Sequence, residues 1–383
     1  MASLITPPAL RSTRSRVDDL LFRICEKVQL SPTQQEEAKR SYNAICNWLD
    51  ANDSSLQIYR PSLFPQGSIA LGTTVKPTGR DEYDVDLVCQ LNIDSRTVSN
   101  PVVLLDMIEQ RLRAHDTYRS LVERKNRCVR INYERLFHLD ILPACPDLIA
   151  GEPNLLIPDS KMQAFSHTNP KGFIQWFQEQ ALKVRPVRFS SMAMDSAAPL
   201  PEPQAWQQKQ VLQLAVQLFK RWRDLYYAGA VELAPVSIVL TTLAGLHYDG
   251  ERQILAALET IVAATLASLP RYGRLVVSNP KNAKEDLSDR WNDPTVYDAF
   301  VHGMRAFEES LRELRDSETI TEATKLIKQL FGEDVTRTVF AEQLREMEPA
   351  RRSESLGVTS AAILSNLSAV ASTPVRANTF YGD

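Results

Sequence analysis

Apolar residues recur at helical spacing in the first third of the chain. Ser31-Pro32-Thr33-Gln34 combines an N-cap residue, a proline at the first helical position and a capping-box glutamine. The apolar stripe that follows consists of Ala38, Tyr42, Ile45 and Leu49. We therefore predict a helix that ends in the polar segment 51–55, and a further helix over roughly 101–115.

A different pattern, with period two, predicts strands between these helices and after them. The run YDVDLVCQL at 83–91 is rich in β-formers, and 128–133 alternates strictly between apolar and polar positions. Phe137 to Ile141 follows after a short turn and predicts another strand. FPQGS at 64–68 is interpreted as a loop, and TVKPTGRDEY at 74–83 as rich in turns. Helices mixed with strands predict an α+β core with a small mixed sheet.

The second half of the chain reads as helical. Its apolar helical faces are those of Val211, Leu214, Leu218 and Trp222 and the runs 238–246 and 254–269. The proline-rich segment 190–203 is interpreted as a linker. We therefore predict a sheet-containing lobe at 1–195, a helical lobe at 196–352 and a flexible tail at 353–383.

Composition narrows the functional class. The chain has 383 residues, a formal charge of −3, 44% hydrophobic and 24% charged residues. That near-neutral balance argues against a protein that coats DNA or RNA, which would carry a large basic surplus. The N-terminus shows no apolar signal segment, and the uncharged stretch 355–375 is too polar for a membrane helix. The cysteines form no CxxC or Cys/His cluster, so we expect a cytoplasmic protein without disulfides or structural zinc: Cys25, Cys46, Cys89, Cys128 and Cys145.

Three aspartates carry the chemistry. Asp84 and Asp86 project from the same face of the predicted strand, about 7 Å apart at ~3.3 Å rise per residue. Two carboxylates so placed favour a divalent cation between them, and Mg²⁺ prefers carboxylate and phosphate oxygens. Asp140, between Leu139 and Ile141, costs stability unless it is paired or metal-bound. If its strand pairs beside the first, three carboxylates form a two-metal site for phosphoryl or nucleotidyl transfer.

Gly67-Ser68 precedes these aspartates, and its residue types suit binding of the donor phosphates in such a reaction. Glycine allows close approach of the backbone to a phosphate, and a helix start after it offers free N–H groups. Taken alone, a DxD pair is more often a solvated turn or strand edge, and Gly-Ser is weaker still. The order of Gly-Ser, a turn, DxD in an apolar β-run and a later buried Asp favours a functional site.

These residues resemble the signature of the polymerase β-like nucleotidyltransferases. FPQGSIALGTTVKPTGRDEYDVDLVCQL is similar in particular to the bacterial CD-NTases, relatives of cyclic GMP-AMP synthase. QVLQLAVQLFKRWRDLYY resembles the family's lobe-bridging helix, APVSIVLTTLAG the next helix, and LVVSNPKNAKEDLSDRW a segment near the base pocket. The resemblance covers roughly residues 10–350.

The resemblance implies a polymerase β-like core, a C-terminal helical lobe and an active site in the cleft between them. It implies that Asp84, Asp86 and Asp140 are catalytic and bind two Mg²⁺ ions, with Mn²⁺ as a substitute. Phosphate contacts fall on Gln66, Gly67, Ser68, Lys220 and Ser237. The implied activity is synthesis of a cyclic di- or trinucleotide second messenger from NTPs such as ATP or GTP, with release of pyrophosphate, in bacterial antiphage (CBASS) signalling.

Several of these residues also allow a structural interpretation. Lys220, with Arg221 and Arg223, also fits a solvated helix face, and Ser237 also fits a helix cap. The basic residues Arg124, Lys125, Arg127 and Arg130 are interpreted as a solvated face, so no nucleic-acid activator is expected. A regulatory or C-terminus-conjugating protein from the same operon is a possible partner, and no membrane contact is expected.

Two other functions compete with the cyclase. One is a template-independent nucleotidyltransferase that acts on RNA or protein, and the other is a silent nucleotide-binding protein. The sequence does not determine which bases the product contains, how large its ring is, or whether its linkages are 2′–5′ or 3′–5′.

Overall fold

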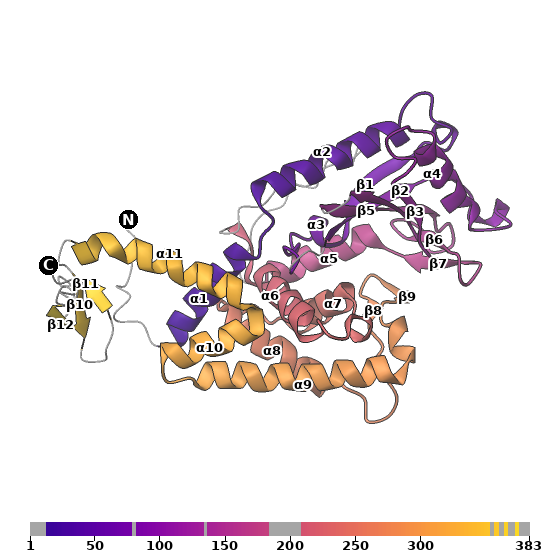
Figure 1. Cartoon of the computed structure of the whole chain (residues 1–383). Coiled ribbons are helices and arrows are strands. Elements are labelled where there is room, and N and C mark those ends of the chain that lie inside the picture. Colours follow the sequence, from indigo (N-terminus) through magenta and orange to yellow (C-terminus); the bar gives the residue numbers. More distant parts are fainter. Residues whose placement is uncertain are drawn as a thin grey trace. The chain divides into compact units, whose positions relative to one another are not determined.

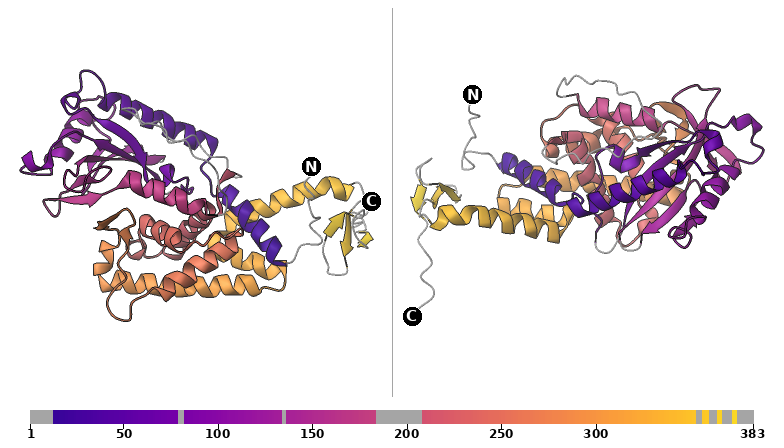
Figure 2. Two further views of the ribbon diagram at one scale, coloured as in Figure 1. Left: turned by 180° about the vertical axis from the view of Figure 1, so that it is seen from behind. Right: turned by 90° about the horizontal axis from the view of Figure 1, so that it is seen from above.

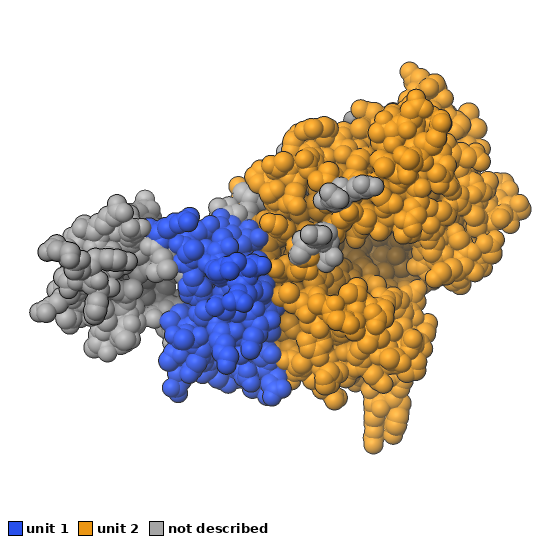
Figure 3. Space-filling model, in the orientation of Figure 1, with its two compact units in different colours: residues 1–27, 309–383 blue, residues 28–308 orange. Residues whose placement is uncertain are grey.

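The computed structural model describes residues 13–78, 82–133, 136–183 and 208–352, together with three short strands near the C-terminus. The predicted linker at 190–203 lies outside the described residues, as does the predicted lobe boundary at 195/196. The chain divides into two compact units, residues 28–308 and residues 1–27 with 309–383 (Figure 3). The division at 195/196 stays a prediction.

A seven-stranded mixed sheet forms one layer of the 28–308 unit (Figure 1). Its strands are β1 (Ser62–Gln66), β2 (Tyr83–Gln90), β3 (Val122–Arg124), β4 (Val129–Tyr133), β5 (Phe137–Pro146), β6 (Leu155–Asp159) and β7 (Ala164–Thr168). The order is β1-β2-β5-β4-β3, and β6 joins β5 to β7. Only the pairing of β2 with β5 is parallel among these described pairs. The predicted α+β class with a mixed sheet is confirmed.

The segment interpreted as a loop at 64–68 is partly a strand, which corrects the sequence analysis. Phe64, Pro65 and Gln66 belong to β1, which pairs antiparallel with β2. Pro65 has no N–H to donate, and β1 tolerates it because this strand lies at the edge of the sheet. Gly67 then begins the four-residue helix α3 (Gly67–Ala70).

Two helices pack on one face of the sheet: α2 (Pro32–Leu49) and α4 (Val103–Arg113). Ser31 caps α2 with the predicted capping box to Gln34, and the predicted stripe is buried. The core between the layers joins Ile45 of α2 to Val85 of β2 and Leu139 of β5, all fully buried. These apolar contacts hold the opposite face of β2 and β5 in place, and the aspartates stand on that face.

The helical part of this unit contains α5 (Pro170–Ala181), α6 (Val211–Tyr226), α7 (Ser237–His247) and α8 (Ile254–Ala267), the hairpin β8 (Ser278–Asn279) and β9 (Asn282–Asp286), and the start of α9 (Pro294–Asp316). Helix α6 packs on α7 and α8. It also contacts the segment after α3, since Gln213 Nε2 donates to Leu71 O at 2.9 Å and Gln217 Nε2 to Thr74 O at 2.6 Å. These bonds fix α6 beside the Gly67-Ser68 turn.

The second unit joins α1 (Thr13–Lys27) to α10 (Ile320–Phe331), α11 (Glu333–Arg352) and the end of α9 (Figure 2). Lys27 Nζ pairs with a carboxylate oxygen of Glu342 at 2.6 Å. The strands β10 (Leu356–Thr359), β11 (Leu364–Asn366) and β12 (Ser372–Pro374) form a small antiparallel sheet within the segment predicted as a tail, whose flexibility stays a prediction. No helix in the described part of the chain has the length and apolar character to cross a membrane.

Candidate active site

The parallel pairing of β2 with β5 brings the aspartates together. Asp86 lies directly opposite Asp140 in the register, and Asp84 lies opposite His138. Val85 and Leu87 are fully buried on the other face, so the predicted alternation is confirmed. The side chain of Asp84 is 54% exposed, whereas that of Asp140 is only 12% exposed. The predicted pairing of the strand of Asp140 beside that of Asp84 and Asp86 is therefore confirmed. The catalytic roles of the three aspartates stay predictions.

Arg130 neutralises much of this acidic charge. It lies on β4 opposite Asp140, and its Nε and Nη2 donate to the two carboxylate oxygens of Asp140 at 2.7 and 2.8 Å. Nη2 also donates to Asp84 at 3.3 Å. The interpretation of Arg130 as part of a solvated basic face was wrong, because strand pairing places it against the acids. Its place on a strictly alternating strand was the signal that could have identified it.

The other basic residues of that supposed face are also paired. Arg124 contacts Asp106 and Glu109, and Lys125 Nζ donates to Glu123 at 2.5 Å. The partners of Arg124 come from α4, which the local sequence does not show, whereas Glu123 is two positions from Lys125. The Lys125–Glu123 pair stays exposed to solvent.

Asp86 stands in the middle of the acidic group. Burial, and then the nearby carboxylates of Asp84 and Asp140, raises its pKa to about 7. The electrostatic field at this point thus disfavours a further negative charge and favours a cation.

The Gly67-Ser68 turn lies against Asp86. Gly67 has φ +64°, and a Cβ atom there would stand 2.1 Å from Asp86 Oδ2. Only glycine fits, because the backbone is left-handed and the space is taken by the carboxylate. Ser68 Oγ accepts a hydrogen bond from Thr74 Oγ1 at 3.1 Å. Gln66 pairs with Asp86 across the β1–β2 ladder.

Lys220 approaches from α6. It is buried, and its Nζ donates to the carbonyl oxygen and hydroxyl of Thr73 at 3.2 and 3.1 Å. Burial, and then the charge of Arg223, lowers the pKa of Lys220 to about 7. Arg221 is buried as well. The interpretation of Lys220 and Arg221 as part of a solvated helix face was therefore wrong.

Ser237 begins α7 and faces α6. Val236, not Ser237, occupies the N-cap position, so the capping interpretation was wrong. Ser237 Oγ instead accepts from Arg223 Nη1 at 2.5 Å. Arg223 is a site residue that the sequence analysis did not select, although its spacing of three from Lys220 places both on one side of α6.

The surface of the 28–308 unit is hollowed (Figure 3). Most of the site residues described above line one cavity of about 710 Å³. It is lined by Gly67, Ser68, Asp84, Asp86, Lys220, Arg223 and Ser237, among others. Asp140 and Arg130 line a second cavity of about 470 Å³ instead. Gln66 is not among the residues that line these two cavities.

The donor set suits a hard cation, but the carboxylates are not gathered around one point. Among the residues that the structure describes, no three His, Cys, Asp or Glu side chains are placed to hold a metal ion together. Asp140 is turned toward Arg130, while Asp84 and Asp86 face the larger cavity. Carboxylate oxygens next to a cavity of ligand size that also holds Lys220 and Arg223 fit Mg²⁺. Asp84, Asp86 and Asp140 are the residues that would hold it.

Asp84 and Asp86 of β2 share a cavity with a lysine, an arginine and a Gly-Ser turn, and Asp140 lies beside Asp86 on the paired strand β5. This arrangement is that of a polymerase β-like nucleotidyltransferase. Comparisons with known proteins agree. Residues 16–181 match the Second Messenger Oligonucleotide or Dinucleotide Synthetase domain. The chain is 32% identical over 381 residues to the c-di-GMP synthase of Roseivirga ehrenbergii, covering 97% of this chain and 99% of that protein. It is 27% identical over 405 residues to the cyclic dinucleotide synthase CdnG of Bradyrhizobium diazoefficiens, covering 96% and 95%.

Solved structures share the fold. The Bradyrhizobium diazoefficiens CD-NTase CdnG in complex with GTP superposes with a TM-score of 0.69 at 23% identity, over 86% of this chain and 99% of that one. Vibrio cholerae DncV in complex with nonhydrolyzable GTP gives a TM-score of 0.53 at 17% identity, over 84% and 86%. The chain belongs to the bacterial CD-NTases, nucleotidyltransferases that synthesise cyclic oligonucleotides, as the sequence motifs predicted.

Proposed function

We propose that this enzyme makes a cyclic dinucleotide from two NTP molecules in an Mg²⁺-dependent reaction that releases pyrophosphate. The observation that carries the proposal is the arrangement of Asp84 and Asp86 in one cavity with Lys220 and Arg223. A relative named c-di-GMP synthase and a structural neighbour bound to GTP make GTP the first substrate to test.

In this proposal, polar residues of the larger cavity hold the donor triphosphate. The backbone at Gly67 and the hydroxyl of Ser68 approach the phosphates from the sheet side, and Lys220, Arg223 and Ser237 approach from α6 and α7. Asp84, Asp86 and Asp140 would hold two Mg²⁺ ions, which supply charge neutralisation and lower the pKa of the attacking hydroxyl. Positioning and electrostatics then account for most of the rate.

The reaction transfers a nucleotidyl group twice. A ribose hydroxyl oxygen of the acceptor forms a bond to the donor's α-phosphorus, and the bond from that phosphorus to the bridging oxygen of the β-phosphate breaks. Pyrophosphate leaves with the electron pair, and the hydroxyl proton passes through Asp140 to solvent. The remaining triphosphate of the linear product then acts as donor, and a second attack closes the ring.

The test is incubation of the protein with Mg²⁺ and GTP, ATP or both, followed by phosphatase treatment and mass spectrometry. A phosphatase-resistant cyclic dinucleotide that is absent with Asp84→Ala/Asp86→Ala supports the proposal. Product made by the double variant would overturn it. Labelled RNA or labelled protein as the sole product would favour the template-independent transferase, and NTP binding without turnover would favour a silent protein.

We further propose a role in antiphage signalling. The support is membership of the family, together with the fold shared with E. coli MS115-1 CdnC, whose structure was solved in complex with HORMA-deltaN. Expression of the chain with its neighbouring genes should reduce phage plaques, and Asp84→Ala/Asp86→Ala should restore them. Equal protection by both proteins would contradict this role.

A further inference from the structure

The second cavity has a cationic rim. Its volume is about 470 Å³, and Asp140 and Arg130 line it on one side. Two turns of the sheet form the rim: the β3–β4 connection contributes Lys125 and Arg127, and the β6–β7 turn contributes Lys161. Lys125 is paired with Glu123. Arg127 is paired with Asp159 and, at longer distance, with Asp289, and Lys161 completes the cations of the rim.

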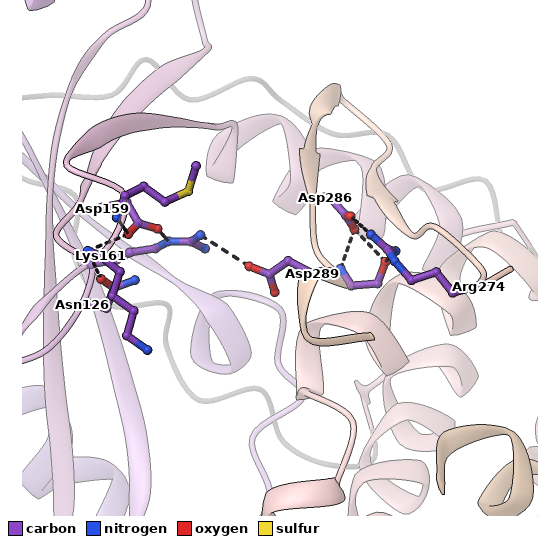
Figure 4. A network of polar contacts seen from close by, with 9 residues as sticks. Asn126, Asp159, Lys161, Arg274, Asp286 and Asp289 are labelled. Atoms are coloured by element: carbon purple, nitrogen blue, oxygen red, sulfur yellow. Dashed lines mark hydrogen bonds and ion pairs between the residues drawn. The ribbon is translucent and has the colours of Figure 1, made fainter. Parts of the chain in front are cut away.

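Hydrogen bonds hold the two turns in fixed register. Asn126 accepts from Ser160 N through its carbonyl oxygen at 3.0 Å and from Lys161 N through Oδ1 at 2.9 Å. Asp159, whose side chain is buried, accepts from the backbone N–H groups of Lys161 and Met162 at 3.0 Å each. Figure 4 shows Asn126, Asp159 and Lys161 gathered at one side of this network. These hydrogen bonds therefore fix the backbone of Lys161 independently of any ligand at its side chain.

Arg127 is positioned by the same group. Its Nε donates to Asp159 Oδ2 at 2.7 Å, and Nη2 reaches Asp289 at 3.5 Å. Asp289 faces the turn from the opposite side, in the short helix η6 (Asp289–Asn292), and its side chain is half exposed (Figure 4). A contact so long and so exposed is weak, and it yields readily to a better anion.

Lys161 is exposed at the cavity. No hydrogen bond or ion pair of its ammonium group to another described residue is found. The rim thus offers an ammonium group, on a backbone that hydrogen bonds hold in place, and a guanidinium that is held by Asp159 through Nε. That chemistry matches a phosphate group.

Asp140 connects the two cavities. It lines the smaller one, and its register neighbour Asp86 lines the larger one. An acceptor hydroxyl placed at Asp140 and directed at the donor leaves the rest of the acceptor on the side of the smaller cavity. Its 5′-phosphates repel those of the donor, which Lys220 and Arg223 hold, so a separate cationic rim is where they are stabilised.

We propose that Lys161 and Arg127 bind the 5′-phosphates of the acceptor nucleotide. The proposal rests on the proposed function, because it assigns the second substrate of the same reaction. Lys161 is a binding residue in this proposal and does not act on the reacting atoms. Its loss should therefore change the discrimination between phosphorylated and unphosphorylated acceptors.

The experiment separates donor from acceptor. The donor is 2′,3′-dideoxy-GTP, which has no hydroxyl for attack. The acceptors are guanosine and guanosine 5′-(α,β-methylene)triphosphate, neither of which can donate. Initial rates of linear product, measured by mass spectrometry with Mg²⁺, give kcat/KM for each acceptor. We expect the wild-type enzyme to prefer the triphosphate by about tenfold or more, the effect of one charge-assisted hydrogen bond.

Three variants make the test specific. Lys161→Ala should reduce the preference several-fold, mainly through KM for the triphosphate acceptor, and Lys161→Arg should retain most of it. Lys284→Ala removes an exposed lysine of β9 that lines neither cavity, and should leave the preference unchanged. No preference in the wild type, or an equal loss for both acceptors in Lys161→Ala, would overturn the proposal. Absence of any product from GTP alone would instead count against the proposed function.

Discussion

Arg130 and Asp140, neighbours on the antiparallel strands β4 and β5, are joined by two parallel hydrogen bonds of 2.7 and 2.8 Å. The side chains are 21% and 12% exposed, so this pair is largely removed from water. It ties the third carboxylate of the site to a cation of the protein itself. The stability of the metal-free enzyme should therefore depend on Arg130.

Arg130→Gln should lower the free energy of unfolding in EDTA by about 1.5–3 kcal/mol, the value of hydrogen bonds to a charged partner. Urea denaturation followed by circular dichroism measures this. Arg130→Lys keeps the charge but loses the two-bond geometry, and should be intermediate. If Arg130→Gln is as stable as the wild type, Asp140 does not need this partner.

Gly67→Ala should abolish product formation. The methyl group would stand 2.1 Å from Asp86 Oδ2, so the carboxylate must move, and the left-handed backbone adds about 1 kcal/mol of strain. Gly151→Ala is the matched control, because Gly151 has φ +73° but open space around its Cβ position. We expect both variants to lose similar stability and only Gly67→Ala to lose at least about a hundredfold in kcat/KM. Equal activity of the two would exclude the contact with Asp86 as the cause.

Lys220→Met should raise the Kd for NTP in calorimetric titration about tenfold or more, since one charge-assisted contact to the phosphates is lost. Folding should be preserved, because methionine fills a similar volume and no longer buries an ammonium group. Lys325→Met, at an exposed position of α10, is the control. Unchanged binding by Lys220→Met would remove Lys220 from the triphosphate site.

Asp159 makes stability depend on pH. Burial opposes its ionisation, but the hydrogen bonds from Met162 N and Arg127 outweigh that effect and lower the pKa of Asp159. A folded-state pKa below the unfolded one contributes stability above about pH 4, which is lost as the pH falls through the folded value. Asp159→Asn should therefore cost about 1–3 kcal/mol at pH 7 and progressively less below pH 4.

Thermal unfolding across pH tests this expectation against Asp298→Asn, an exposed aspartate of α9. The control should follow the wild-type curve at every pH. A deficit in Asp159→Asn that persists unchanged into acid would mean that the loss comes from packing and not from charge.

The sequence alone was sufficient for the elements whose signal is local. The capping box at Ser31, the alternation around Asp84 and Asp86, and the glycine at 67 each follow from a few adjacent residues, and the structure contains all three features. β1 was missed because Phe64 to Gln66 is stabilised by its ladder to β2, whose paired residues lie 20 to 24 positions further along the chain.

The tertiary structure decided which charges meet. Local alternation places Arg130 on the polar face of its strand, but only strand pairing shows that its partners are Asp140 and Asp84. Likewise, Lys220 is buried against Thr73 because α6 packs beside the Gly67-Ser68 turn. The sequence determined which chemical groups the site contains, since side-chain alternation and glycine geometry are local properties. Their partners, burial and pKa values depend on strands and helices far apart in the chain, because electrostatic interactions act through space and only the fold sets those distances.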